Sequence, residues 1–306
     1  GGAGFIGSHI VEHFQGRADI RVLDNLRTGS RQNLEGLECE FIEASILDAA
    51  ALARAMEGVD YVFHLAALIS VPESMERPHE CVDLNVNGLL KVLEAASSAT
   101  VKKLVLASSA AVYGDNPSVP KVETMIPEPQ SPYAITKLDG EYYCEMWQRE
   151  GRLDTACLRF FNVFGPRQDP SSAYAAAVPI FIAKARKGEP ITIFGDGEQT
   201  RDFVYVKDIA AGLAYAAQTD SVSGTYNIGY GVSTSIKHLA EKILSITDSG
   251  SEIKYAPTRP GDVKHSRASA DKLAATGWEP LYSFEQGLEE TLHESSSTPR
   301  PRESPA

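Results

Sequence analysis

The sequence contains few positive charges and no long apolar run. Its 41 Asp and Glu residues outnumber its 29 Lys and Arg residues, so the formal net charge is −12. Nucleic-acid-binding proteins usually carry a basic patch or stripe, and we find none, so this class is disfavoured. No stretch of about 18 apolar residues occurs, so the sequence predicts no membrane-spanning helix. We therefore expect neither nucleic acid nor a membrane as a partner.

Cysteine is also scarce, and its spacing is irregular. The four cysteines are Cys39, Cys81, Cys144 and Cys157, and none of them forms a Cys-x-x-Cys pair. Isolated thiols in a chain of 306 residues are typical of a reducing compartment. No group of His, Cys and carboxylate residues has the spacing of metal ligands, so we expect no metal site. We find no signal-peptide pattern and expect a cytoplasmic protein.

The two ends of the sequence differ from the rest. It opens directly at GGAGFIGS, without an apolar strand before the glycines, and closes with the polar, Pro-rich SSSTPRPRESPA. A glycine loop of this kind normally follows a strand, so we expect about six apolar residues upstream of Gly1. The closing stretch cannot bury enough apolar surface to order itself, and we expect a disordered tail over residues 295–306.

Between these ends, short apolar runs alternate with amphipathic stretches. We predict strands in IRVLDN, ECEFIEAS, VDYVFHLAAL, VKKLVLASSAAVYG and DTACLRFFNVFG, and helices in HIVEHF, ALARAMEG and NVNGLLKVLEAASS. This alternation favours an α/β protein whose parallel sheet is covered on both faces. After Gly165, loops rich in Pro and Gly separate helices such as AVPIFIAKARKG and IKHLAEKILSI. We predict a first domain over residues 1–163 and a smaller one over 164–294, partly interleaved with the first.

The glycines at the start have the spacing of a dinucleotide-binding loop. Gly1, Gly4 and Gly7 permit a tight turn, a close approach of the backbone to a pyrophosphate, and packing of the following helix. Asp24 ends the next strand, where a carboxylate accepts hydrogen bonds from the adenosine ribose and repels a 2′-phosphate. The two features together predict a Rossmann-type, doubly wound domain that binds NAD. Arg27 and Arg31 lie nearby, so NADP stays open.

The segment SPYAITK places a tyrosine and a lysine one helical turn apart. Pro132 suits a first helical turn, and Tyr133 and Lys137 then lie at i and i+4 on the same side. An ammonium near a phenol favours the phenolate and lowers the tyrosine pKa from about 10, as a general base requires. Ser108 and Ser109 end the preceding strand, where a hydroxyl could bind the same substrate hydroxyl. The Tyr-x-x-x-Lys pattern alone is common, so the inference depends on the glycine loop and Asp24.

In this order, these motifs resemble the extended short-chain dehydrogenase/reductase family over nearly the whole chain, to about residue 290. Within it the sequence is most similar to the nucleotide-sugar 4-epimerases that act on UDP-glucose and UDP-N-acetylglucosamine. The resemblance implies that Ser109, Tyr133 and Lys137 are the catalytic residues. It implies NAD-binding residues at Gly1, Gly4, Phe5, Ile6, Gly7, Asp24, Asn25, Leu26, Ser45, Ile46, Leu65, Ala66, Ala67, Asn85, Ala107, Tyr133, Lys137 and Phe160. It implies substrate-binding residues at Ser109, Asn162, Ala176, Val178, Thr192, Phe194, Arg201, Arg259, Asp262 and Ser266.

One position departs from the family pattern. Ser45 stands where the family usually has an aspartate for the adenine amino group, so we expect a weaker or rearranged contact there. Two other positions decide between reactions. Ala110 and Ala111 follow Ser109, where the family's 4,6-dehydratases carry an acidic pair and its decarboxylases a glutamate. Alanine cannot transfer a proton, so both rival reactions are disfavoured.

The resemblance therefore implies 4-epimerisation of a UDP-hexose through a 4-keto sugar. Ser266 lies four residues after Asp262, where a tyrosine would restrict the family's site to unmodified hexoses. With Ala176 and Ala177 also small, we expect UDP-GlcNAc and UDP-GalNAc as substrates, with UDP-glucose and UDP-galactose as a second pair. Another nucleotide sugar such as UDP-glucuronate stays open, as does a non-catalytic NAD-binding sensor or scaffold. The resemblance also implies a homodimer formed by the Tyr133 helix and the helix over residues 85–98.

Overall fold

The central sheet of the protein has four parallel strands. The computed structural model describes residues 1–170, 176–258 and 263–294. The sheet order is β10-β5-β4-β3, and the strands are β3 (Tyr61–His64), β4 (Lys103–Ser109), β5 (Asp154–Phe160) and β10 (Gly224–Ile228). A second parallel pair joins β1 (Arg21–Asp24) to β2 (Glu40–Glu43). All five strands predicted from the sequence are present, so the α/β fold is confirmed.

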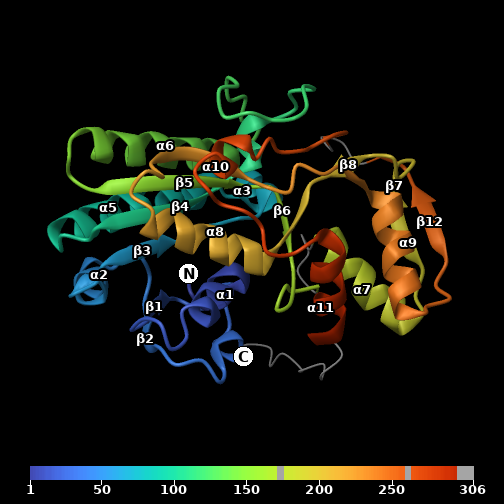
Figure 1. Cartoon of the computed structure of the whole chain (residues 1–306), viewed down its shortest axis with the longest axis horizontal. Coiled ribbons are helices and arrows are strands. Elements are labelled where there is room, and N and C mark those ends of the chain that lie inside the picture. The colour runs from blue at the N-terminus through green and yellow to red at the C-terminus, as the bar shows by residue number, and fades with distance from the viewer. Residues whose placement is uncertain (171–175, 259–262, 295–306) are drawn as a thin grey trace.

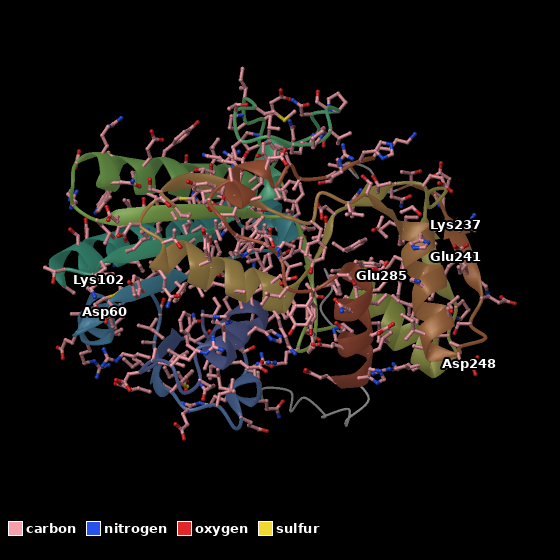
Figure 2. The ribbon with its side chains drawn as sticks, in the orientation of Figure 1. Asp60, Lys102, Lys237, Glu241, Asp248 and Glu285 are labelled. Atoms are coloured by element: carbon pink, nitrogen blue, oxygen red, sulfur yellow. The ribbon has the colours of Figure 1, made fainter. Side chains whose placement is uncertain are left out.

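Helices cover both faces of this sheet. On one face, α6 (Pro132–Arg149) packs on β4 and β5, with α5 (Gly88–Ser98) beside it and α2 (Ala49–Met56) against α5. On the other face, α8 (Val206–Gln218) packs on the same strands and on α1 (Phe5–His13) (Figure 1). All of β4 before Ser109 is buried, as expected for a strand covered on both faces. At the amino end of the sheet, Lys102 pairs with Asp60 on the surface, at 2.8 Å (Figure 2).

Two elements of this layer come from the second half of the chain. Neither α8 nor β10 was recognised in the sequence, yet both pack on the first sheet, and β10 pairs with β5 along its whole length. Lys103, buried at the start of β4, stabilises the end of α8 because its Nζ donates hydrogen bonds to the carbonyls of Ala216, Thr219 and Val222. These two elements from the second half of the chain thus pack on the sheet of the first half, and the predicted division into two interleaved domains stays a prediction.

The remaining elements form a second core beside the sheet. Here α7 (Ala177–Lys187) and α9 (Ile236–Thr247) pack on the parallel pair β7 (Ile191–Phe194) and β12 (Ile253–Ala256), and α11 (Phe284–Glu294) packs on α9 (Figure 1). Two short pairs connect the cores: β6 (Asn162–Phe164) with β9 (Phe203–Tyr205), and β8 (Thr200–Arg201) with β11 (Thr234–Ser235). The short helical segments are η1 (Arg31–Leu34), α3 (Val71–Glu76), α4 (Pro78–Val82), η2 (Asp83–Asn87), η3 (Ala110–Tyr113) and α10 (Asp271–Ala274).

The two sheets are separated at the start of the chain. The Gly1 nitrogen donates a hydrogen bond to the Leu23 carbonyl of β1 at 2.6 Å, and Gly1 also lies against Leu65 and Ala66, which follow β3. Between β1 and β3 lies a cavity of about 150 Å³ lined by residues of both strands. None of the described helices is long and apolar enough to span a membrane, and the expected tail, 295–306, lies outside the described residues.

Candidate active site

The glycine loop leaves no room for side chains where the chain turns into α1. A Cβ at Gly7 would lie 2.2 Å from the Gly1 carbonyl oxygen, and one at Gly1 would lie 2.5 Å from the Ala66 nitrogen. Gly4 is the N-cap of α1, and it provides no side-chain hydrogen bond to the first turn, which also contains no acidic residue. The first N–H groups of α1, at Phe5, Ile6 and Gly7, have no hydrogen-bond partner within the helix, as an anion site at a helix N-terminus requires.

Asp24 is tied to this loop. Its carboxylate is buried, and it accepts hydrogen bonds from the Ala3 N–H at 3.0 Å and the Leu26 N–H at 2.8 Å. Leu26 has a left-handed backbone, with φ 57°, which bends the chain back over the strand end. Each carboxylate oxygen keeps a lone pair for a ribose hydroxyl. The loop, Asp24 and the α1 N-terminus thus fit the pyrophosphate and adenosine ribose of NAD.

The other predicted cofactor residues follow the carboxyl ends of successive strands. Asp24 and Asn25 end β1, Ser45 and Ile46 follow β2, and the remaining positions are Leu65, Ala66 and Ala67 after β3, Ala107 in β4, and Phe160 at the end of β5. This edge is where open α/β sheets bind ligands. The Ser45 hydroxyl accepts a hydrogen bond from the Leu47 N–H at 3.2 Å. The weaker or rearranged adenine contact expected at Ser45 stays a prediction.

Asn85, predicted on the cofactor side, forms its described hydrogen bonds with the protein itself. It lies in η2, a π-helical turn, and its side chain is buried. Its Oδ1 accepts from the Leu68 N–H at 2.7 Å, while its Nδ2 donates to the Leu68 carbonyl and to Thr136 Oγ1, each at 3.0 Å. Asn85 therefore joins the segment after β3 to α6. These bonds occupy its amide, and a role of Asn85 at the cofactor stays a prediction.

The three predicted catalytic residues meet at the end of β4. Ser131 caps α6 by accepting a hydrogen bond from the Ala134 N–H, and Pro132 fills the first turn as predicted. The Lys137 Nζ lies 5.8 Å from the centre of the Tyr133 ring and donates a hydrogen bond of 2.7 Å to the Ala107 carbonyl. Ser109 ends β4 two residues later. A phenol, an amine and a hydroxyl therefore lie at one strand end.

The expected lowering of the Tyr133 pKa is wrong for this structure. Burial raises the pKa of Tyr133 above its ordinary value, and a hydrogen bond with Ser109 opposes this only in part. Burial also lowers the pKa of Lys137 to about 8, against the influence of Cys81 and Glu141. The i, i+4 spacing predicted the relative positions of the two side chains. It did not predict the free-energy cost of removing both charged groups from water.

The predicted substrate residues fall into two groups. Arg201 and Ser266 are joined through Thr200: the Ser266 N–H donates to the Thr200 carbonyl at 3.1 Å, and Arg201 NH1 donates to the same carbonyl at 2.9 Å. The second group is spread over β6, α7 and β7 and consists of Asn162, Ala176, Val178, Thr192 and Phe194. Val178 is buried in the second core, whereas Ala176 is exposed. Arg259 and Asp262 lie outside the described residues.

Asp202 is a residue of this region that the sequence analysis missed. It is fully buried beside Arg201, and its carboxylate accepts hydrogen bonds from the N–H groups of Tyr230, Gly231 and Ala268 at 2.9, 2.9 and 3.0 Å. Burial raises its pKa, while the three backbone bonds favour the charged form. Asp202 thereby fixes the loop after β10 and the segment that carries Ser266. The signal was an acidic residue directly before the apolar run FVY, in TRDFVY.

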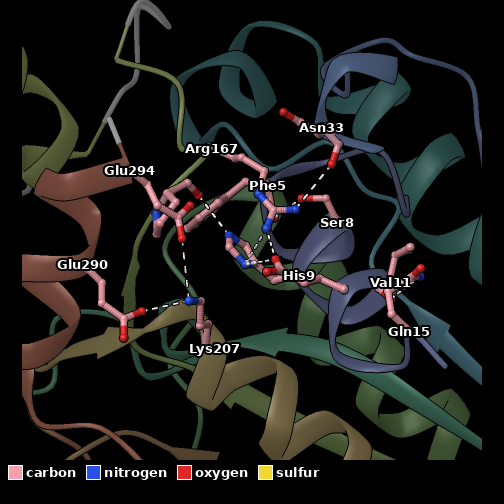
Figure 3. A network of polar contacts seen from close by, with 12 residues as sticks. Phe5, Ser8, His9, Val11, Gln15, Asn33, Arg167, Lys207, Glu290 and Glu294 are labelled. Atoms are coloured by element: carbon pink, nitrogen blue, oxygen red, sulfur yellow. Dashed lines mark hydrogen bonds and ion pairs between the residues drawn. The ribbon is translucent and has the colours of Figure 1, made fainter. Parts of the chain in front are cut away.

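A polar network holds α1 against the loop that follows β6 (Figure 3). Arg167, with φ 65°, contacts Glu12 and donates to Asn33 O at 3.3 Å, while the buried His9 meets the Pro166 carbonyl at 3.0 Å. The pKa of Glu12 is lowered to about 2, first by the hydrogen bond between Glu12 and His9 and then by the charge of Arg167. On the neighbouring side, Lys207 contacts Glu290 at 2.8 Å (Figure 3). The helix that follows the glycine loop is therefore fixed to the chain segment that follows Asn162.

Comparison with known proteins places this geometry in a family. Residues 1–229 match the model of the NAD dependent epimerase/dehydratase family. The chain belongs to this family. A UDP-glucose 4-epimerase of Mycolicibacterium smegmatis is 36% identical over 95% of this chain and 96% of its own. The solved UDP-N-acetylglucosamine 4-epimerase of Methanobrevibacter ruminantium, in complex with UDP-N-acetylmuramic acid, has 41% identity, a TM-score of 0.93, and coverage of 97% and 96%.

A third protein carries the cofactor. The UDP-glucose 4-epimerase of Thermus thermophilus in complex with NAD has 38% identity and a TM-score of 0.88, with 97% of both chains covered. The resemblance read from the sequence, the Rossmann-like fold and NAD as cofactor are thus confirmed, and the protein is an NAD-dependent enzyme of this family.

Proposed function

We propose that the protein is an isomerase that inverts C4 of a UDP-hexose. The observation that carries this proposal is the identity of the residues around Ser109. Tyr133 and Lys137 supply a base and a cation, whereas Ala110 and Ala111 in η3 offer no proton donor next to them. A dehydratase or decarboxylase would need an acid there. The relatives described above, which are 4-epimerases by name, support the same reaction.

The residues divide the work of this reaction. Tyr133 accepts the proton of the C4 hydroxyl, and Ser109 holds that hydroxyl in line with the phenol. Lys137 supplies positive charge to the phenolate, while the Ala107 carbonyl keeps its Nζ in place. Bound NAD supplies a hydride acceptor and donor, so that the sugar is oxidised at C4 and then reduced on its opposite face. Arg201 can hold the pyrophosphate through its guanidinium while the sugar turns.

For the substrate we propose UDP-GlcNAc and UDP-GalNAc, with UDP-glucose and UDP-galactose as a second pair. Ser266 is small, and its position beside Arg201 is fixed by the backbone bond to Thr200. That placement supports a sugar pocket with room for an N-acetyl group. The bond from Thr200 Oγ1 to His265 Nδ1, 3.0 Å long, holds the same segment from its other side.

The test is incubation of the protein with UDP-GlcNAc without added nucleotide, followed by NMR of the anomeric protons. Formation of UDP-GalNAc supports both the reaction and the roomy pocket. Conversion of UDP-glucose alone would retain the mechanism and refute the interpretation of Ser266. If neither sugar reacts after NAD is added, another nucleotide sugar such as UDP-glucuronate or the non-catalytic NAD-binding role takes precedence.

A homodimer is the second part of the proposal. Large apolar side chains are exposed on α6, at Ile135 and Tyr142, and on the adjoining α3 and α4, at Val71, Met75 and Val82. A contiguous exposed apolar patch is typical of a protein interface. Helix α5, which we also expected in the contact, exposes no large apolar side chain. Light scattering should therefore report a dimer that Tyr142→Glu converts to a monomer, whereas a monomeric wild-type protein would refute the proposal.

The four unpaired cysteines fit a reducing compartment, and we propose the cytoplasm.

A further inference from the structure

A buried ion pair lies behind the predicted catalytic residues. Glu141 of α6 and Arg159 of β5 are each 4% exposed. They form a two-pronged contact, with Arg159 Nε 2.9 Å from Glu141 Oε1 and Arg159 NH2 2.7 Å from Oε2. The hydroxyl of Ser108 donates a further hydrogen bond to Oε1. Three elements, α6, β4 and β5, are thus tied together by one carboxylate.

The same three elements carry the proposed chemistry. Ser108 directly precedes Ser109 in β4, and Glu141 follows Lys137 by one turn of α6, on the same side of the helix as Tyr133. A buried ion pair is weak evidence for a stabilising role, because apolar residues of similar volume are often as stable. The location of this pair, directly behind a strand-end serine and a lysine, indicates a role in placing them.

Arg159 is held from its far side as well. Its NH1 donates to the Tyr113 hydroxyl at 2.9 Å, and that hydroxyl donates to Asn227 Oδ1 of β10 at 2.7 Å. Tyr113 and Asn227 are fully buried. The guanidinium therefore cannot follow a carboxylate that moves away, and the position of Glu141 is set by the sheet.

The surroundings of Lys137 show why this carboxylate matters electrically. Three titratable groups raise the pKa of Lys137: Cys81 of α4, Glu141 of α6 and Cys157 of β5. Glu141 is the only carboxyl group among these three. His64 of β3 is also close, but burial lowers its pKa to about 3, so it is neutral. Burial works against the Lys137 ammonium, and Glu141 works for it.

We propose that Glu141 is a positioning residue of the reaction: held by Arg159 and Ser108, it fixes α6 against β4 and presents a carboxylate one turn from the Lys137 ammonium. This inference rests on the proposed function for its kinetic test, but not for its spectroscopic one. Loss of the negative charge lowers the pKa of Lys137, so the lysine loses its proton at a lower pH. The alkaline limb of the pH profile of kcat then moves to lower pH.

The experiment compares Glu141→Gln with Glu141→Asp and with the matched control Glu145→Gln. Glutamine preserves volume and removes charge, aspartate preserves charge, and Glu145 lies exposed one turn further along α6. We expect the alkaline limb of Glu141→Gln to move down by about one pH unit, so that kcat at a fixed alkaline pH falls about tenfold, with KM within about twofold. Glu141→Asp should restore the wild-type limb at a reduced kcat, and Glu145→Gln should behave as wild type.

A second readout needs no turnover. In protein labelled with ¹³C at the lysine ε carbons, the Lys137 signal, assigned by its loss in Lys137→Arg, is titrated directly. A lower midpoint in Glu141→Gln supports the proposal even if the wild-type enzyme converts neither UDP-sugar. A midpoint and a pH profile identical to wild type, with only a lower melting temperature, would show that the pair is merely structural. Should Glu141→Gln not fold, the double variant Glu141→Gln/Arg159→Gln, which leaves no unpaired charge, takes its place in both measurements.

Discussion

Gly7→Ala is the most direct test of the cofactor loop. The new Cβ would lie 2.2 Å from the Gly1 carbonyl oxygen, 2.7 Å from the Gly2 Cα and 3.0 Å from the Gly1 carbonyl carbon. All three are backbone atoms, so no side chain can rotate away, and the loop itself must move. Overpacking of this kind costs about 1–3 kcal/mol. If the displaced loop loses this free energy from its contact with NAD, the dissociation constant rises about 5- to 150-fold.

The assay is the amount of NAD that remains with the protein after gel filtration, released by denaturation and quantified by chromatography. Gly250→Ala is the matched control, because a Cβ there meets no atom within 4 Å. Gly4→Ala separates two causes: its Cβ meets only the Gly1 carbonyl oxygen, at 3.3 Å, so a loss of NAD without a lower melting temperature must arise from the ligand side. Wild-type NAD retention by Gly7→Ala would refute the assignment of this loop to the pyrophosphate.

Three further predictions concern the site itself. Tyr133→Phe should lower kcat about 10²- to 10⁴-fold, the usual range of general acid–base catalysis, and a near-normal rate would remove Tyr133 as the base. Ser266→Tyr should abolish turnover of UDP-GlcNAc and spare UDP-glucose, and an equal loss on both sugars would contradict the pocket assignment. The folded-state pKa of Lys137 is about 8, below its ordinary 10.5, so the unfolded chain binds more protons between these values and stability should rise with pH across this window. Lys137→Met should lack this rise, up to about 3 kcal/mol, in denaturant titrations at pH 8 and 10.

Most of the fold could be predicted from the sequence, and the elements that were not predicted have a common cause. Each predicted strand consists of adjacent residues whose apolar character is visible locally. The pairing of β10 with β5 joins residues 224–228 to residues 156–160, and no local sequence pattern predicts it. The same holds for α8, whose Ala-rich sequence VKDIAAGLAYAAQ shows no polar face because it lies between the sheet and α1.

The site was predicted at the level of motifs but not at the level of charges. Gly7, Asp24 and Tyr133 stand in patterns with fixed spacing, and the structure brings each to the carboxyl edge of the strands. Glu141 and Asp202 were not predicted as site residues, because charged residues are almost never fully buried, yet both of these are. Only the fold shows that their partners, Arg159 and a set of backbone N–H groups, come from distant segments.

The error in the pKa of Tyr133 is informative about how the site works. The reaction needs a phenolate and an ammonium, and burial disfavours both charged forms at these positions. Two charges that burial disfavours singly can support each other when they lie close together. The phenolate therefore gains most when Lys137 is protonated, and Lys137 keeps its proton best when Glu141 is ionised. Through Lys137, the negative charge of Glu141 therefore stabilises the phenolate of Tyr133, although the two residues are not in contact by any described hydrogen bond.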